Sequence, residues 1–239
     1  MALVLFNNMT EKDKGNAVEH LICESTPRQD FFLLVILSVL MATFGLLINS
    51  VSIIIGSMLI APILYPILGL SLGVVIADGK LITRSFYTLL KSVAFGIAGS
   101  AIITIFFSSN FQMNPEILAR TQPSLIYGTV AMIAGLAASF ALIKPQLSAT
   151  LPGTAISVAL IPPLAVTGIG VARFDWGMIT NSFILFLINA IGIIFASMVV
   201  FSLMHLYVKR DVASKTIKKE NLAIEKEQKD AEKEAKKDN

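Results

Sequence analysis

Apolar residues in this sequence gather in long runs that short polar segments separate. The runs cover residues 31–48, 51–77, 86–107, 123–143, 147–171 and 178–207. A helix needs ~20 residues to cross ~30 Å of hydrocarbon at ~1.5 Å per residue, and the runs are close to or above that length. The pattern therefore predicts an all-α integral membrane protein with about six transmembrane spans.

Two of the six runs contain prolines that a regular helix would not tolerate. The second run carries Pro62 and Pro66, and the fifth carries Pro152 and the pair Pro162-Pro163. A proline inside a helix removes one hydrogen bond and frees the carbonyl four residues earlier, at a cost of ~3 kcal/mol that lipid cannot relieve. We expect both runs to be broken helices whose breaks face protein or water.

The two proline-containing runs also resemble each other. At a shift of 100 residues, Ser57, Pro62 and Leu64 match Ser157, Pro162 and Leu164, and after a three-residue deletion Asp78 matches Asp175. If each unit holds three spans, the second copy crosses the membrane in the opposite direction. The sequence thus predicts two inverted repeats, residues 31–108 and 123–207, and a chance likeness of two proline-broken helices is the alternative.

The distribution of basic residues predicts the orientation. Lys80, Arg84, Lys144 and the tail fall on one side of a six-span arrangement, whereas Arg120 and Arg173 fall on the other. Basic loops stay in the cytoplasm, so both termini are expected there. The net charge of +3 arises largely in the tail and therefore does not indicate nucleic-acid binding.

The ends of the chain differ from the predicted transmembrane domain, residues 31–207. Residues 1–30 form a short polar cytoplasmic segment, and residues 208–239 form a charged cytoplasmic helical tail. Ile217, Ile224 and Ala231 recur at seven-residue spacing, which leaves a short coiled coil as the alternative to a solvated, frayed helix.

The breaks offer polar atoms that could meet a solute or ion. The freed carbonyls would include those of Met58, Pro62, Val158 and Ala159, beside the hydroxyls of Ser57 and Ser157. The Asn amides are the other intramembrane candidates. The predicted pathway consists of Ser57, Met58, Pro62, Pro66, Ser157, Val158, Pro162, Pro163, Asn49 and Asn189. Kinks satisfied by neighbouring hydroxyls or water, and amides that only join helices, are the alternatives.

Ionisable residues are scarce in the predicted spans. Asp78 and Asp175 lie only at span ends, which argues against a proton-driven pump. The single cysteine, Cys23, and two distant histidines, His20 and His205, give no nucleophile with a base and no metal cluster. We therefore expect no enzyme, no cofactor and no metal.

Small residues predict close helix or subunit packing. Ala131, Gly135 and Ser139 recur at four-residue spacing, and Gly69 and Gly73 do the same. Such faces let membrane helices approach, so a homo-oligomer is expected besides contact with membrane lipid. We interpret the chain as a passive channel or permease for a small solute or ion. The alternative is a membrane scaffold or sensor whose cytoplasmic tail recruits a partner.

Two stretches carry a resemblance to a known family. Residues 55–62 with 66–69, and residues 159–169 with Trp176 and 185–189, resemble the domain of unknown function 389 family of prokaryotic hydrophobic membrane proteins. The resemblance covers roughly residues 28–201, although Ser57 and Ala77 replace the family's usual Ala and Gly. It implies a multi-pass protein of the prokaryotic inner membrane and no substrate, and the prediction of transport rests on the repeat and the breaks alone.

Overall fold

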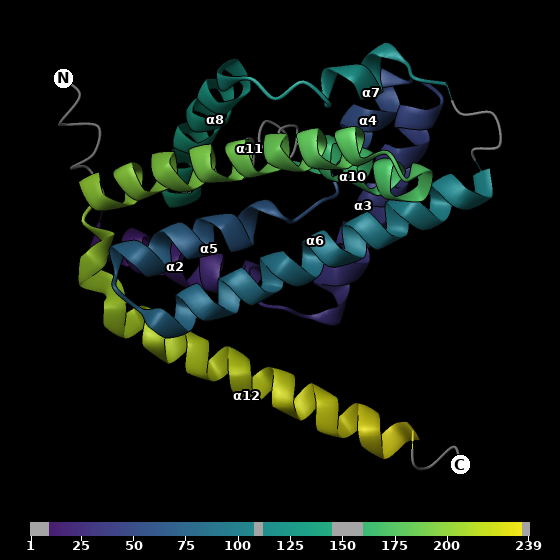
Figure 1. Ribbon diagram of the computed structural model, residues 1–239. Coiled ribbons are helices and arrows are strands. Elements are labelled where there is room, and N and C mark those ends of the chain that lie inside the picture. The colour runs from purple at the N-terminus through teal and green to yellow at the C-terminus, as the bar shows by residue number, and fades with distance from the viewer. Residues whose placement is uncertain (1–9, 108–111, 145–159, 236–239) are drawn as a thin grey trace.

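The computed structural model describes residues 10–107, 112–144 and 160–235, with side chains up to residue 226 at the C-terminal end, and its regular elements in these ranges are helices (Figure 1). They are α2 (Glu11–Glu24), α3 (Gln29–Leu47), α4 (Val51–Met58), α5 (Leu64–Val75), α6 (Gly79–Phe107), α7 (Pro115–Ala119), α8 (Leu125–Ile143), α10 (Ile161–Arg173), α11 (Trp176–Leu203), the 3-10 turn η1 (Leu206–Lys209) and α12 (Arg210–Ala235).

Four of these helices are long and apolar enough to cross a membrane: α3, α6, α8 and α11. The two further apolar helices, α5 and α10, have 12 and 13 residues and would cover only ~18–20 Å. The described part of the chain thus has the composition of an integral membrane protein with four full-length candidate spans. The count of six spans and the opposite orientation of the halves stay predictions.

The second apolar run is divided. α4 ends at Met58 and α5 begins at Leu64, with Pro62 in the link between them. The carbonyl of Pro62 accepts a hydrogen bond from the N–H of Tyr65 at 3.1 Å. The expectation of a free carbonyl at Pro62 is therefore wrong, because the turn at the start of α5 supplies this carbonyl with a hydrogen-bond donor.

The other prolines of the predicted pathway start helices. Pro66 lies in the first turn of α5, and Pro162 and Pro163 lie in the first turn of α10. The first N–H groups of a helix have no intrahelical acceptor, so a proline there removes no hydrogen bond. These three prolines thus lie at helix starts and not inside a helix, while residues 145–159, with Pro152, Ser157 and Val158, lie outside the described ranges.

The turns from α5 to α6 and from α10 to α11 have the same geometry. The residue before the acid has a left-handed backbone, with φ of 53° at Ala77 and 56° at Phe174. The N–H of Asp78 and that of Asp175 each donate to a glycine carbonyl five residues earlier, at 2.9 and 3.0 Å. Each carboxylate then caps the next helix, because its Oδ1 accepts from the N–H three residues later at 3.0 and 2.9 Å. The residues that matched in sequence thus form equivalent corners.

The corner from α3 to α4 repeats this backbone path, which the sequence comparison missed. Asn49 has φ of 57°, and the N–H of Ser50 donates to the carbonyl of Gly45 at 2.8 Å. In all three corners the glycine is required by close approach: a Cβ on Gly45, Gly73 or Gly170 would lie 2.9–3.0 Å from a backbone nitrogen of the following helix.

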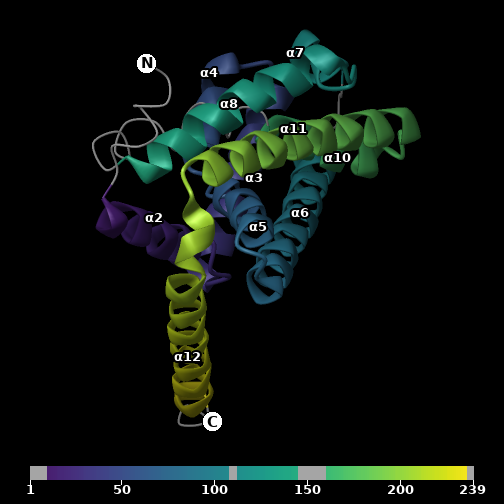
Figure 2. The ribbon, with the colours of Figure 1, turned by 90° about the vertical axis from the view of Figure 1, so that its left-hand side faces the viewer.

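The two short helices pack across the halves of the molecule. α5 contacts its hairpin partner α6 and also α11, and α10 contacts its hairpin partner α11 and also α6. The α5–α6 corner and the α10–α11 corner lie apart in both views (Figures 1 and 2). Each short helix is thus held between its own partner and the long helix of the other half.

The predicted small-residue faces are packing faces within the chain. A Cβ on Gly135 of α8 would lie 2.9 Å from the Cα of Ile193 in α11, and Ala131 and Ser139 beside it are buried. Gly69 approaches Ser85 of α6 in the same way. Close helix packing is confirmed, whereas the homo-oligomer stays a prediction that these faces do not support.

Both polar ends of the chain pack onto the bundle. The N-terminal segment forms α2, which a capping box at Thr10 starts and which contacts α5, α8 and α12. In α12 the buried side chains follow helical spacing and are Ala213, Thr216, Ile217 and Glu220. The expectation of a solvated, frayed tail is therefore wrong for the first half of α12.

Candidate functional site

The end of α4 carries the first residues of the predicted pathway. Ser57 is fully buried, and its hydroxyl donates to the carbonyl of Ile54 at 2.6 Å. The carbonyl of Ser57 accepts from the hydroxyl of Ser38 in α3, also at 2.6 Å. Met58 is buried next to it. The break after α4 is thus tied to α3 through buried polar atoms.

A second buried polar cluster joins three helices and was missed in the sequence. The hydroxyl of Ser100 in α6 donates to the carbonyl of Ala165 in α10 at 2.7 Å. The hydroxyl of Thr43 in α3 lies 2.9 Å from the oxygen of Ser100. Gly168 permits this contact, because a Cβ there would lie 2.5 Å from the Cβ of Ser100. A serine in an apolar run has no local signal that sets it apart, so only the tertiary structure identifies it.

The two asparagines of the predicted pathway have different places. Asn49 lies exposed at the α3–α4 corner, where its left-handed backbone conformation forms the turn. Asn189, in contrast, is buried in α11. Ser85 and Ser182, each seven residues after the matched acids Asp78 and Asp175, are both buried, and their hydroxyl oxygens have no hydrogen-bond partner within the described residues. Buried hydroxyls of this kind are available to a ligand or water.

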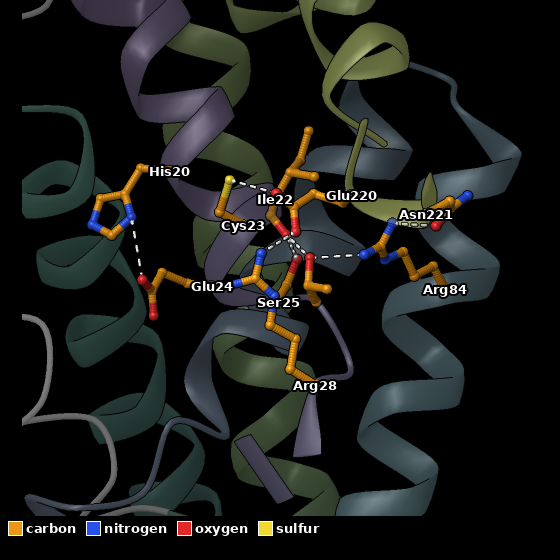
Figure 3. A network of polar contacts seen from close by, with 10 residues as sticks. His20, Ile22, Cys23, Glu24, Ser25, Arg28, Arg84, Glu220 and Asn221 are labelled. Carbon is orange, nitrogen blue, oxygen red and sulfur yellow. Dashed lines mark hydrogen bonds and ion pairs between the residues drawn. The ribbon is translucent and has the colours of Figure 1, made fainter. Parts of the chain in front are cut away.

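A polar network joins α12 to the start of the bundle, and we call it the tail junction: Cys23, Thr26, Arg28, Arg84, Glu220 and Asn221 (Figure 3). The carboxylate of Glu220 lies 2.7 Å from a guanidinium nitrogen of Arg28 and accepts from the thiol of Cys23 at 3.4 Å. The side chain of Glu220 is only 7% exposed. Burial and the Glu220 carboxylate raise the pKa of Cys23 to about 11, so the thiol stays protonated at neutral pH.

Arg84 is the member of the tail junction that belongs to α6. Its guanidinium donates to Thr26 Oγ1 and to Asn221 Oδ1, each at 2.7 Å (Figure 3). Both acceptors are neutral, and its buried Nε has no partner in the described part of the chain. The sequence placed Lys80 and Arg84 in a loop, and this is corrected: α6 begins at Gly79, because the corner at Asp78 caps it directly.

A cavity of about 960 Å³ lies beside the tail junction, between the first turns of α6 and the first half of α12. Its lining residues are Asp78, Gly79, Lys80, Thr83, Arg84, Tyr87, Arg210, Ser214, Ile217 and Asn221. The structure therefore presents two candidate sites: the buried polar clusters around the ends of α4 and α10, and this basic cavity.

Comparisons with known proteins place the chain among uncharacterised proteins. A family model described as domain of unknown function (DUF389) matches residues 58–195. An uncharacterized protein of Methanocaldococcus jannaschii is 36% identical over 173 residues, which are 71% of this chain and 52% of that protein. The chain thus spans about half the length of this curated relative. No solved structure matches this chain.

Proposed function

Because the chain belongs to the family described as domain of unknown function 389, whose name assigns no activity, we propose that it is a passive channel or permease for a small solute or ion. One observation carries the proposal. Two apolar helices too short to cross the bilayer, α5 and α10, are buried between the long helices of opposite halves. In transporters, solute sites form where such interrupted helices end inside the protein.

Polar atoms at the end of α4 and in the first turns of α10 support the proposal. The Ser38–Ser57 contact lies where α4 ends, and the Thr43–Ser100–Ala165 cluster lies in the first turns of α10. Polar groups buried in a membrane bundle are costly unless they are hydrogen-bonded, as these are, and a carbonyl oxygen keeps a second lone pair that a solute could use. Among the four long helices the one carboxylate is Asp30, in the first turn of α3, which favours passive movement over proton coupling.

The proposed arrangement in the membrane follows from the basic residues and the equivalent corners. We place Lys80, Lys144 and both termini on the cytoplasmic side of a prokaryotic inner membrane, and Arg120 and Arg173 on the other side. The Asp78 and Asp175 corners would then face opposite aqueous phases, as inverted repeats require.

Site-directed labelling tests this orientation. The assay uses right-side-out vesicles and a Cys23→Ala background. Single cysteines at Lys80 and Lys144 should react with a membrane-impermeant maleimide only after the vesicles have been opened. Cysteines at Arg120 and Arg173 should react from outside without that step. Equal labelling of positions 80 and 173 from one side would contradict the inverted arrangement.

A flux assay tests the function itself. In liposomes loaded with a panel of small ions and neutral solutes, the protein should raise the permeability to at least one above that of empty liposomes. Thr43→Val/Ser100→Ala should change that permeability several-fold, because it removes two buried hydroxyls from the proposed path. Thr129→Val, which alters an exposed threonine of α8, is the matched control and should leave it unchanged.

If liposomes that contain the wild-type protein are no more permeable than empty ones to every solute tried, transport is contradicted. The scaffold or sensor then remains as the function. The docking of α12 bears on that alternative. Its face with Ile217 and Glu220 is already occupied within the chain, so a recruited partner would have to displace it or use the opposite face.

A further inference from the structure

The basic cavity between α6 and α12 has an excess of positive charge. Lys80, Arg84 and Arg210 line it, against the single carboxylate of Asp78. That carboxylate is already engaged: Oδ1 accepts from the N–H groups of Lys80 and Leu81, and Oδ2 accepts from the hydroxyl of Ser214 at 3.2 Å. Asp78 thus closes a helix end and offsets only one of the three positive charges of the lining.

The three cations of the cavity make no ion pair within the described residues, and Glu220 of the neighbouring tail junction is paired with Arg28. Arg84 donates to two neutral oxygens, and neither Lys80 nor Arg210 makes an ion pair there. Thr83, Ser214 and Asn221 add neutral polar groups to the same lining. Guanidinium and ammonium groups beside hydroxyls are the groups that bind phosphate oxygens.

The same cavity continues onto an apolar face of a membrane-spanning helix. Tyr87 lines the cavity and is about half exposed, and Leu90, one turn further along α6, is exposed to a similar degree. The ammonium of Lys91 lies 4.5 Å from the centre of the Tyr87 ring. A ligand with a phosphate in the cavity could therefore extend an acyl chain along Tyr87 and Leu90, where lipid would lie.

We propose that this cavity binds the phosphate of an anionic phospholipid headgroup, with Lys80, Arg84 and Arg210 as its cationic ligands. The site bridges α6 and α12, so a bound headgroup would hold the C-terminal helix against the bundle. Basic pockets beside the ends of membrane helices bind such headgroups by charge. The proposal does not depend on transport.

Lipid binding to the purified full-length protein tests the site. We would measure phosphatidylglycerol retention by native mass spectrometry and the melting shift that this lipid causes, with phosphatidylcholine as the neutral lipid. Lys80→Gln/Arg210→Gln should weaken phosphatidylglycerol binding by roughly tenfold or more. Both side chains are exposed, so the variant should fold, and Arg84 is left intact because it holds Thr26 and Asn221.

Two further arms identify the source of the phosphate and the specificity of the effect. Lys12→Gln/Lys219→Gln removes the same charge from exposed positions outside the cavity and should bind phosphatidylglycerol like the wild type. Glycerol 3-phosphate, which has the phosphate without acyl chains, should not compete at millimolar concentration. Competition by it would overturn the lipid in favour of a soluble phosphate compound, and equal loss in both double variants would overturn the site.

Discussion

Gly168→Ala is expected to destabilise the protein strongly, although it adds one methyl group. The new Cβ would lie 2.5 Å from the Cβ of Ser100 and 2.7 Å from the carbonyl oxygen of Ile97. The second neighbour is backbone of α6, which cannot turn away as a side chain could. Overpacking of this kind costs ~1–3 kcal/mol, and here α10 must also move away from α6 and stretch the Ser100–Ala165 hydrogen bond. The melting temperature in detergent should fall by several degrees.

The matched control is Gly99→Ala, the same change in α6. Its nearest neighbour would be the Cδ2 of Leu40 at 3.4 Å, an ordinary contact. Alanine favours helix over glycine by ~1 kcal/mol, so this variant should melt at or slightly above the wild-type temperature. If both variants melt alike, α6 and α10 do not approach as closely as the structure has them.

The apolar runs predicted the long helices well because burial in lipid and helix length follow from local composition. Residues 31–48 and 123–143 correspond to α3 and α8, with ends within a few residues. The match of Asp78 with Asp175 identified two equivalent corners, since an acid that caps a helix leaves a local signature. These features depend on neighbours in sequence.

The remaining features depend on partners far along the chain. Pro162 and Pro163 were interpreted as breakers, but a proline is compatible with a helix start, and sequence alone did not locate where α10 begins. Ser100 lies 65 residues from its acceptor Ala165. Glu220 and Arg28 are 192 residues apart, and each looks like an ordinary charge on a polar segment. This ion pair helps to dock α12 on the bundle, although the sequence of the tail predicts a solvated helix.

Glu220→Ala is accordingly expected to release α12 from the bundle. The substitution leaves the Arg28 guanidinium without its carboxylate, 2.7 Å away in the wild type, and removes the acceptor of the Cys23 thiol. Breaking a buried ion pair costs ~3–5 kcal/mol, and because Arg28 is 38% exposed we expect about 2 kcal/mol here. Trypsin should then cut at Lys215, Lys218 and Lys219 roughly 30-fold faster, since cleavage tracks the population of undocked helix.

Two variants separate the ion pair from a general loss of charge. Glu19→Ala removes an exposed carboxylate of α2 and should leave the cleavage rate of α12 unchanged. Arg28→Ala/Glu220→Ala should be cut little faster than Glu220→Ala alone, because the ion pair is already broken once Glu220 is replaced. If the effects of Glu220→Ala and Arg28→Ala on the cleavage rate, each measured alone, simply add in the double variant, the ion pair contributes nothing to docking. The buried face at Ala213 and Ile217 would then hold α12 without it.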